Sequence, residues 1–172
     1  GEKTAFGLNR AINPSRNQPG SSIKPLATIA PGLQEGIITA ASVFDDAPFK
    51  KGSYAPHNSY SGYKGLSNIR YMISISQNVS QVRLLEKVTP QKAIDFMIKM
   101  GVKSAEKADA SLPLVLGAVD EVPPIEMATA YSVIANGGEY IEPTFYSKVV
   151  DSEGKIVYEP HQERNRVMSE QN

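Results

Sequence analysis

The sequence predicts a helix-rich α+β fold, and three observations lead to this class. Apolar residues recur at helical spacing in several segments that are bounded by capping or helix-breaking residues. Strand-like patterns are few and favour one hairpin near the C-terminus. No internal repeat with a period of about 20 to 50 residues is visible, and 172 residues suit one domain or most of one.

Composition and charge exclude several classes of protein. Apolar residues make up 41% of the chain and charged residues 21%, which is typical of a folded domain and too apolar for a disordered chain. Lysine plus arginine number 18 and aspartate plus glutamate 18, so no net positive field attracts a phosphate backbone, and we expect no nucleic-acid partner. Cysteine is absent, and the two histidines, His57 and His161, lie far apart, which favours surface positions. We expect no metal and no cofactor.

The ends of the chain suggest a piece of a longer protein. It starts without methionine, and its N-terminus lacks the basic and apolar stretches of a signal peptide. Its longest apolar runs are shorter than the roughly 20 residues that span a bilayer. We therefore expect any membrane anchor to lie outside this chain.

A helix is predicted directly after residue 20. Asn17-Gln18-Pro19-Gly20 is a turn signal, and Ser21 suits the N-cap of the helix that follows. Its apolar stripe comprises Ile23, Leu26, Ala27 and Ala30. Pro31 is expected to kink or end this helix, with Gly36 as the stop.

The middle of the chain predicts a long surface loop followed by two helices. Residues 43–65 mix aromatic, Pro, Gly, Ser and Asn residues without sustained periodicity. Ser67 is expected to cap the first helix, whose stripe of Leu66, Ile69 and Ile73 runs on to Ser76. The second helix follows Asn78 and carries Val82, Leu85 and Val88. Residues 76–78 are therefore expected to lie between two helices.

Two further helices have clear start and stop signals. Thr89-Pro90 begins one that ends at Gly101, with a stripe of Ala93, Phe96, Met97 and Met100. Pro123-Pro124 begins the other, which ends at Gly137-Gly138. Its expected inward face consists of Met127, Ala128, Tyr131, Ile134 and Ala135. A β-hairpin is predicted last, with residues 145–150 and 155–158 on either side of the turn 151–154.

The strongest chemical signal is Ser21 followed three residues later by Lys24. On a helix this spacing places the two side chains one turn apart on one face, so that the amine can reach the hydroxyl. A partly desolvated lysine has a lowered pKa and can accept the hydroxyl proton. Backbone N–H groups at the helix N-terminus suit the oxyanion that forms on acylation. We interpret Ser21 as a nucleophile and Lys24 as its base.

The spacing alone is weak, because three more copies occur. They are Ser61-Gly62-Tyr63-Lys64, Ser104-Ala105-Glu106-Lys107 and Ser152-Glu153-Gly154-Lys155. These lie in a predicted loop, on a charged face and in a predicted hairpin turn, whereas only Ser21 opens a helix after a Pro-Gly turn. From this motif alone, a capping serine with a surface lysine has about equal weight.

A second candidate motif is Ser76-Gln77-Asn78. Ser76 continues an apolar stripe, so its hydroxyl should be partly buried and needs a partner. A hydroxyl that relays a proton and an amide that holds a substrate carbonyl would suit this place. The alternative is a helix cap at a helix–helix joint. Ser15-Arg16-Asn17 has the same pattern but lies in the turn-rich N-terminal segment.

Together these segments resemble the transpeptidase domain of class A penicillin-binding proteins. The resemblance rests on Asn9-Arg10-Ala11, on Arg16 to Pro25 and on Ser76-Gln77-Asn78, 55 residues after Ser21. It extends through residues 131–138 and the predicted hairpin 149–155, and so covers nearly the whole chain. Gln77 stands where the general motif of penicillin-binding proteins and class A β-lactamases has Asp, which is closer to the synthases.

The resemblance implies D,D-transpeptidation through a serine acyl-enzyme, on a penicillin-binding and serine β-lactamase-like fold. By carry-over, Ser21 is the nucleophile, Lys24 the base, Ser76 a proton relay and Asn78 a contact to the substrate amide. The implied partners are peptidoglycan stem peptides and β-lactam antibiotics. The implied location is the extracytoplasmic face of the bacterial cell membrane, with a membrane anchor and a glycosyltransferase domain outside this chain.

The chain departs from the family pattern at its ends. The third motif, Lys-Thr-Gly or Lys-Ser-Gly on a core strand, is absent, and Lys3-Thr4-Ala5 is no substitute because it lacks the glycine and precedes the nucleophile. We expect residues 1–172 to be a partial transpeptidase domain that lacks core strands at both ends and has little or no activity alone. Two alternatives stay open: a β-lactam-hydrolysing or D,D-carboxypeptidase relative, and a catalytically silent sensor or interaction module.

Overall fold

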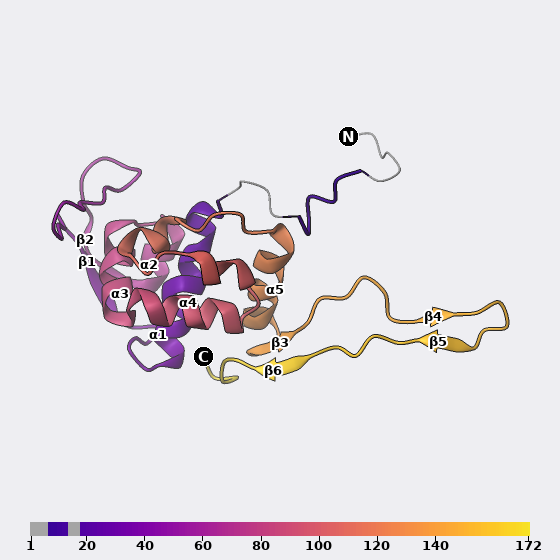
Figure 1. Cartoon of the computed structure of the whole chain (residues 1–172). Helices are drawn as coiled ribbons and strands as arrows, with labels where there is room; N and C mark the ends of the chain where they lie inside the picture. Colours follow the sequence, from indigo (N-terminus) through magenta and orange to yellow (C-terminus); the bar gives the residue numbers. More distant parts are fainter. Residues whose placement is uncertain (1–6, 14–17) are drawn as a thin grey trace.

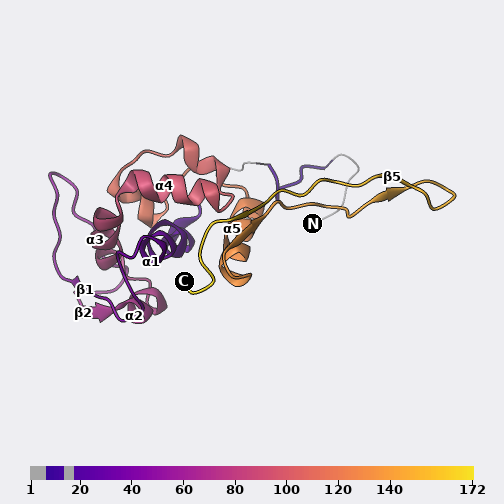
Figure 2. The same ribbon diagram turned by 90° about the horizontal axis from the view of Figure 1, so that it is seen from below.

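Helices form the body of the molecule, and a long β-hairpin projects from one end of it (Figures 1 and 2). The computed structural model describes residues 7–13 and 18–172, so the sequence features at residues 3–5 and 14–17 lie outside the described residues. In chain order the helices are α1 (Ala30–Gln34), α2 (Ile69–Ser74), α3 (Val79–Val88), α4 (Pro90–Lys99) and α5 (Pro124–Ala135). The strands are β1 (Val43–Asp46), β2 (Gly65–Asn68), β3 (Glu139–Ile141), β4 (Val149–Val150), β5 (Ile156–Tyr158) and β6 (Arg164–Arg166). The predicted helix-rich α+β class is confirmed.

One helical segment, residues 20–34, runs through the middle of the body and is called the central helix below. It consists of a 3₁₀ turn (Gly20–Ile23), a π turn (Pro25–Ile29) and α1. The predicted apolar stripe is buried, with the side chains of Ile23, Leu26, Ala27 and Ala30 at most 2% exposed. The central helix is therefore part of the core, and its polar residues Lys24 and Thr28 are buried with it.

Pro31 does not end the central helix, because α1 continues to Gln34. Pro31 occupies the first turn of α1, where a missing N–H costs little. Just before it, the Ala30 N–H donates to the Pro25 carbonyl five residues back, in the wider π geometry. The helix then stops at Gly36 as predicted, in the left-handed region with φ +68°.

The helices α3 and α4 confirm their predicted faces and pack against the central helix. On α3, the side chains of Val82, Leu85 and Val88 are fully buried. On α4, Ala93 and Met97 are fully buried and Phe96 is 7% exposed, and the chain leaves the helix at Gly101 with φ +99°. Local periodicity and capping residues thus placed both helices correctly.

The prediction for α2 was wrong in its start and correct for only one residue of its stripe, Ile69. Ser67 belongs to β2, and Asn68 caps α2 instead, because its side-chain oxygen accepts the Tyr71 N–H at 2.9 Å. The buried residues of α2 are Ile69 and Met72, whereas the predicted Leu66 and Ile73 are 79% and 41% exposed. Strand β2 pairs antiparallel with β1, and this pairing turns Leu66 outward.

The inward face of α5 also differs from the prediction. Thr129, Ala130 and Val133 are buried, while Tyr131 and Ile134 are 39% and 44% exposed. The cause is the close contact with Gly101: a Cβ atom there would lie 2.9 Å from Thr129 Cγ2 and 2.8 Å from the Tyr140 ring. A glycine without a side chain therefore turns the Thr129 face of α5 toward α4.

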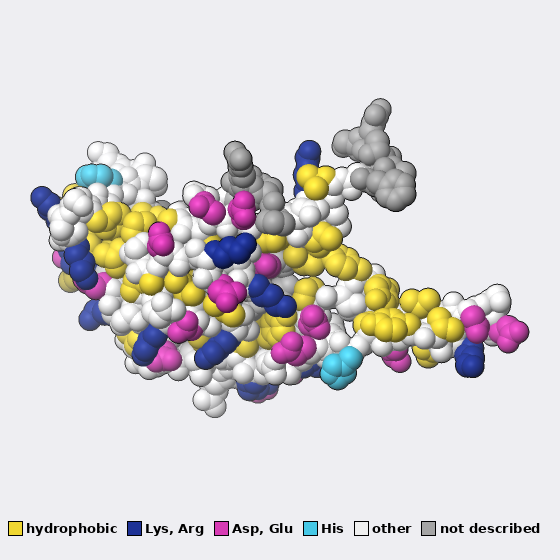
Figure 3. All heavy atoms as spheres, in the orientation of Figure 1, with side chains coloured by type: hydrophobic (Ala, Val, Ile, Leu, Met, Phe, Trp, Pro, Cys, Tyr) yellow, Lys and Arg dark blue, Asp and Glu magenta, His cyan; other side chains and the backbone are white. Residues whose placement is uncertain are grey.

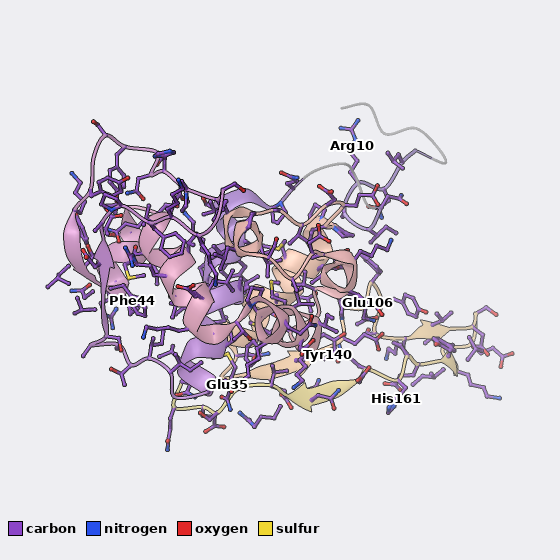
Figure 4. The ribbon with its side chains drawn as sticks, turned by 60° about the vertical axis from the view of Figure 1, so that its left-hand side comes forward. Arg10, Glu35, Phe44, Glu106, Tyr140 and His161 are labelled. Atoms are coloured by element: carbon purple, nitrogen blue, oxygen red, sulfur yellow. The ribbon has the colours of Figure 1, made fainter. Side chains whose placement is uncertain are left out.

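In the part of the chain that the structure describes, the strands form three separate two-stranded antiparallel sheets: β1–β2, β3–β6 and β4–β5. The pairing of β1 with β2 shortens the predicted surface loop to residues 47–64, and β4–β5 is the predicted hairpin. Apolar side chains follow the projecting hairpin in Figure 3, and Phe145 and Val157 are 70% and 59% exposed. Figure 4 shows His161 on this projection, far from Phe44 at the opposite end of the body. Within the described residues, no helix is long and apolar enough to cross a bilayer.

Candidate active site

A buried lysine on the central helix is the centre of the candidate site. Lys24 is only 3% exposed. Its Nζ donates to the Ser76 carbonyl at 2.8 Å, to Ser76 Oγ at 3.0 Å and to Asn78 Oδ1 at 2.6 Å. The structure therefore brings together three of the four residues that the sequence proposed for the site, from segments more than 50 positions apart in the chain.

Burial makes the Lys24 amine a better proton acceptor near neutral pH, because it lowers the pKa of the amine. Removal from water penalises its charged form and lowers its pKa from 10.5 to about 8. No carboxylate among the described residues forms an ion pair with it that would restore the charge. At pH 7 roughly a tenth of such amines are neutral, against about 1 in 3,000 for an unperturbed lysine.

Ser76 faces Lys24 because of its backbone conformation. It lies in the joint between α2 and α3, as predicted, and is half-buried. Its φ of +54° is in the left-handed region, which is uncommon for a residue other than glycine. This conformation directs both the carbonyl and the hydroxyl of Ser76 at the same Nζ atom. Strain of this kind clusters at functional sites.

Asn78 is held at both ends of its side-chain amide. Its Oδ1 accepts from Lys24 Nζ at 2.6 Å, and its Nδ2 donates to the His57 carbonyl at 2.7 Å. An amide nitrogen carries two hydrogens, and the described residues use one of them. The second N–H is available to a ligand.

Gln77 points away from the site into the interior. It is fully buried, its Nε2 donates to Ser67 Oγ at 2.9 Å, and its Oε1 accepts from the Ser80 hydroxyl. Gln77 therefore joins β2 to α3 behind the site. A carboxylate at this position would lose the Nε2 donation to Ser67.

Ser21 lies one helical turn before Lys24, and the Lys24 N–H donates to the Ser21 carbonyl. The prediction that Ser21 caps the helix is wrong, because the 3₁₀ turn already begins at Gly20 and Ser21 is inside it. Its side chain is exposed and its hydroxyl makes no hydrogen bond to the described residues. The Lys24 amine contacts Ser76 and Asn78 instead of Ser21, so Ser21 is adjacent to the cluster and free to rotate.

The turn that carries Ser21 is supported by residues that sequence reasoning missed. Gly20 has φ +56°, and a Cβ atom on Gly117 would lie 2.4 Å from the Gly20 Cα atom. The Tyr131 hydroxyl donates to the Ser22 carbonyl at 2.7 Å. Glycine at 117 is the sequence signal that was available, but it does not reveal which backbone approaches it.

The three other Ser-x-x-Lys copies lack this environment. Lys64, Lys107 and Lys155 are all exposed, and none donates to a serine side chain. Among the four lysines, burial with an adjacent serine hydroxyl belongs to Lys24 alone. Lys24 is also the one whose sequence context predicted a site.

Comparison with known proteins identifies relatives along nearly the whole chain. The family model described as the penicillin binding protein transpeptidase domain matches residues 4–172. Penicillin-binding protein 1A of Clostridium botulinum (strain Hall) is 34% identical over 181 residues, covering 98% of this chain and 22% of that protein. Penicillin-binding protein 1F of Bacillus subtilis is 31% identical over 169 residues, covering 98% and 23%. The chain thus spans about a quarter of the length of these curated relatives.

Solved structures give the same result. The crystal structure of penicillin-binding protein 1A from Haemophilus influenzae superposes with a TM-score of 0.78 at 34% identity, covering 91% of this chain and 24% of that chain. The PonA1 protein from Mycobacterium tuberculosis in complex with penicillin V gives a TM-score of 0.83 at 25% identity, covering 97% and 46%.

Proposed function

The chain belongs to the penicillin-binding protein transpeptidase family, and on this premise we propose that it carries the nucleophile-bearing part of a serine D,D-transpeptidase. The observation that carries the proposal is the buried Lys24 amine, one turn from Ser21 and 3.0 Å from Ser76 Oγ. An exposed serine hydroxyl beside an amine of lowered pKa is the arrangement that acyl transfer requires.

In the first step, the Ser21 oxygen attacks the carbonyl carbon of the D-Ala-D-Ala bond of a stem peptide. Lys24 in its neutral form takes the hydroxyl proton, which a rotation of the free Ser21 side chain brings within reach. The first backbone N–H groups of a helix have no partner within it, so those at the start of the central helix are the proposed donors to the oxyanion. General base catalysis of this kind contributes about 10²- to 10⁴-fold.

In the second step, the C–N bond breaks and the leaving amine needs a proton. The Lys24 ammonium donates to Ser76 Oγ at 3.0 Å. Ser76 therefore donates its hydroxyl proton to the leaving nitrogen and takes a proton from Lys24 in its place. The acyl group stays on Ser21 until the amine of a second stem peptide attacks it. That amine loses a proton as Ser21 regains one, and the site returns to its starting state.

Asn78 is the proposed contact to the substrate backbone. Its Oδ1 is occupied by Lys24 and one of its N–H groups by His57, so the remaining N–H can donate to a substrate amide carbonyl. Such a contact aligns the scissile bond with Ser21, and orientation of this kind contributes strongly to acyl transfer.

For the whole protein we propose the partners and location that the family resemblance implies. Residues 1–172 form part of a penicillin-binding domain that accepts stem peptides and β-lactams at the extracytoplasmic face of the cell membrane. The membrane anchor and the glycosyltransferase domain lie in other parts of the protein, for which the relatives' greater length leaves room.

The test is covalent labelling of the full-length protein with a fluorescent penicillin, followed by peptide mapping of the labelled serine. Ser21→Ala should abolish labelling and leave thermal stability nearly unchanged, because the Ser21 side chain is exposed. Matched controls are Ser61→Ala, Ser104→Ala and Ser152→Ala, which should label normally. Label mapped to one of these three serines would overturn the assignment, and an adduct that lasts seconds instead of hours would indicate a hydrolase.

A further inference from the structure

A half-buried asparagine of the loop 47–64, Asn58, joins a buried carboxylate to the candidate site. The Nδ2 of Asn58 donates to Asp46 Oδ1 at 2.7 Å, and Asp46 is fully buried. The Oδ1 of Asn58 accepts the N–H of Asn78 at 2.9 Å and the N–H of Val79 at 3.3 Å. Hydrogen bonds thus link Asp46 through the Asn58 side chain to the backbone of Asn78, whose own side chain contacts the Lys24 amine.

Each of these two side-chain amides has one chemically possible orientation. If the Asn58 amide turned over, its oxygen would face the Asp46 carboxylate and its NH₂ would face two N–H groups. If the Asn78 amide turned over, its NH₂ would face the Lys24 amine and its oxygen the His57 carbonyl. Both inversions create repulsive contacts, so Asp46 and the two backbone N–H groups fix the Asn58 amide, while Lys24 and the His57 carbonyl fix the Asn78 amide.

Two adjacent residues of the loop form hydrogen bonds with Asn78. Asn58 holds the backbone N–H of Asn78, and the carbonyl of His57 holds its side chain. One hydrogen bond leaves a side chain free to rotate about it, whereas bonds to backbone and side chain together define its position. The Asn78 Oδ1 atom is therefore placed at Lys24 by the loop and not by α3 alone.

The loop itself is fastened to the body. Asp46 also accepts the Tyr60 hydroxyl at 2.6 Å and the Lys64 N–H at 2.9 Å, so one carboxylate holds both ends of the segment 58–64. On α3, Arg83 donates to the Pro48 carbonyl at 3.1 Å and stacks on Phe49. These contacts make the loop a rigid support for the atoms that it presents.

We propose that Asn58, oriented by Asp46, is a positioning residue that holds Asn78 against Lys24 and thereby sets the geometry of acylation. The proposal rests on the proposed function, since its consequence is measured on the Ser21 acyl-enzyme. Neither residue touches the reacting atoms. Their effect reaches the reaction through Asn78.

Loss of Asn58 should change the amine as well as the rate. With Asn78 released, water reaches Lys24, and because burial lowers the pKa of that amine, hydration raises the pKa from about 8 toward its ordinary value. The described groups that contact the amine, Ser76 and Asn78, are neutral, and the lysines and the histidine of the loop are exposed, namely Lys50, Lys51, His57 and Lys64. A shift in the pH dependence of acylation therefore reports the environment of Lys24.

The experiment measures the second-order rate of labelling by a fluorescent penicillin in the full-length protein, from well below to well above pH 8. Asn58→Ala should lower the plateau rate about 10- to 100-fold and move the midpoint of the rise to higher pH. Asn68→Ala is the matched control, because it removes the asparagine that caps α2 and that forms no hydrogen bond with Lys24, Ser76 or Asn78. Asn68→Ala should lower the stability about as much as Asn58→Ala and leave the midpoint of the pH dependence of labelling unchanged.

The second variant, Asp46→Asn, keeps the shape of the side chain and covers the case in which Asn58→Ala does not fold. A neutral amide offers one oxygen and one NH₂ to three donors, so at least one donor loses its acceptor. It should lower the rate less than Asn58→Ala and move the midpoint in the same direction. Wild-type midpoints in the folded variants, or a shift of equal size in Asn68→Ala, would overturn the proposal. Failure of the wild-type protein to label at Ser21 would instead refute the proposed function.

Discussion

Replacement of Lys24 by arginine separates a lysine that takes a proton from one that only supplies charge. Lys24 has a pKa of about 8, so roughly a tenth of the amines are neutral at pH 7. An arginine, with a pKa above about 12, is neutral in fewer than about 1 in 10⁵ molecules at this pH. The supply of free base falls by about 10⁴, and the acylation rate should fall by the full contribution of general base catalysis, about 10²- to 10⁴-fold.

The structure also indicates the side effect to control for. The Lys24 amine sits among three acceptors at 2.6 to 3.0 Å and is almost fully enclosed, so a guanidinium must displace Ser76 or Asn78. Overpacking of this kind costs about 1 to 3 kcal/mol, which thermal unfolding will report. The matched control is Lys155→Arg, the same substitution in an exposed copy of the motif, which should change neither rate nor stability.

The assay is the time course of fluorescent-penicillin labelling across pH. In the wild-type protein the rate should rise with pH and level off above about 8, because the neutral amine is the active form and deprotonation produces it. In Lys24→Arg no rise with this midpoint should remain. A folded Lys24→Arg protein with a wild-type rate and midpoint would refute the role of Lys24 as base and leave it an electrostatic one.

Two further predictions concern the support of the site and the faces of the helices. Gly117→Ala should destabilise the protein by about 2 kcal/mol or more in thermal unfolding and should slow the labelling of Ser21. The reasons are the φ of +98° at Gly117 and the new Cβ atom, which would lie 2.4 Å from the Gly20 Cα atom. Unchanged stability would mean that the two turns do not touch. Leu85→Ala should cost about 2 to 5 kcal/mol, since Leu85 is fully buried, whereas Leu66→Ala, at a residue 79% exposed, should change stability by less than about 0.5 kcal/mol. Denaturant unfolding measures the stability of both variants. An equal loss of stability in the two would mean that Leu66 faces inward, as the sequence predicted.

Sequence alone determined the features that depend on neighbours in the chain. The start of α4 at Thr89-Pro90, its end at Gly101 and the buried face of α3 follow from caps and 3.6-residue spacing, which act within a few turns. The choice of Ser21 among four similar motifs also came from local context, the Pro-Gly turn and the apolar stripe after it. Such signals are short-range, so they can be read without the fold.

The tertiary structure decided which of several possible faces and contacts exists. The sequence placed Leu66 and Tyr131 inward, but the pairing of β2 with β1 turns Leu66 outward, and the close approach at Gly101 selects another face of α5. These contacts join residues far apart in the chain, and periodicity cannot identify the partner.

The same distinction holds in the candidate site. Ser21 and Lys24 are visible as a local motif, but the lowered pKa of Lys24 depends on burial that arises only when the central helix is enclosed by α3, α4 and their connections. Asp46 and Asn58 carry no motif at all and lie 32 and 20 positions before Asn78. Their hydrogen bonds exist because the loop 47–64 folds back on the joint between α2 and α3, and a contact made by chain reversal leaves no periodic signal in the sequence.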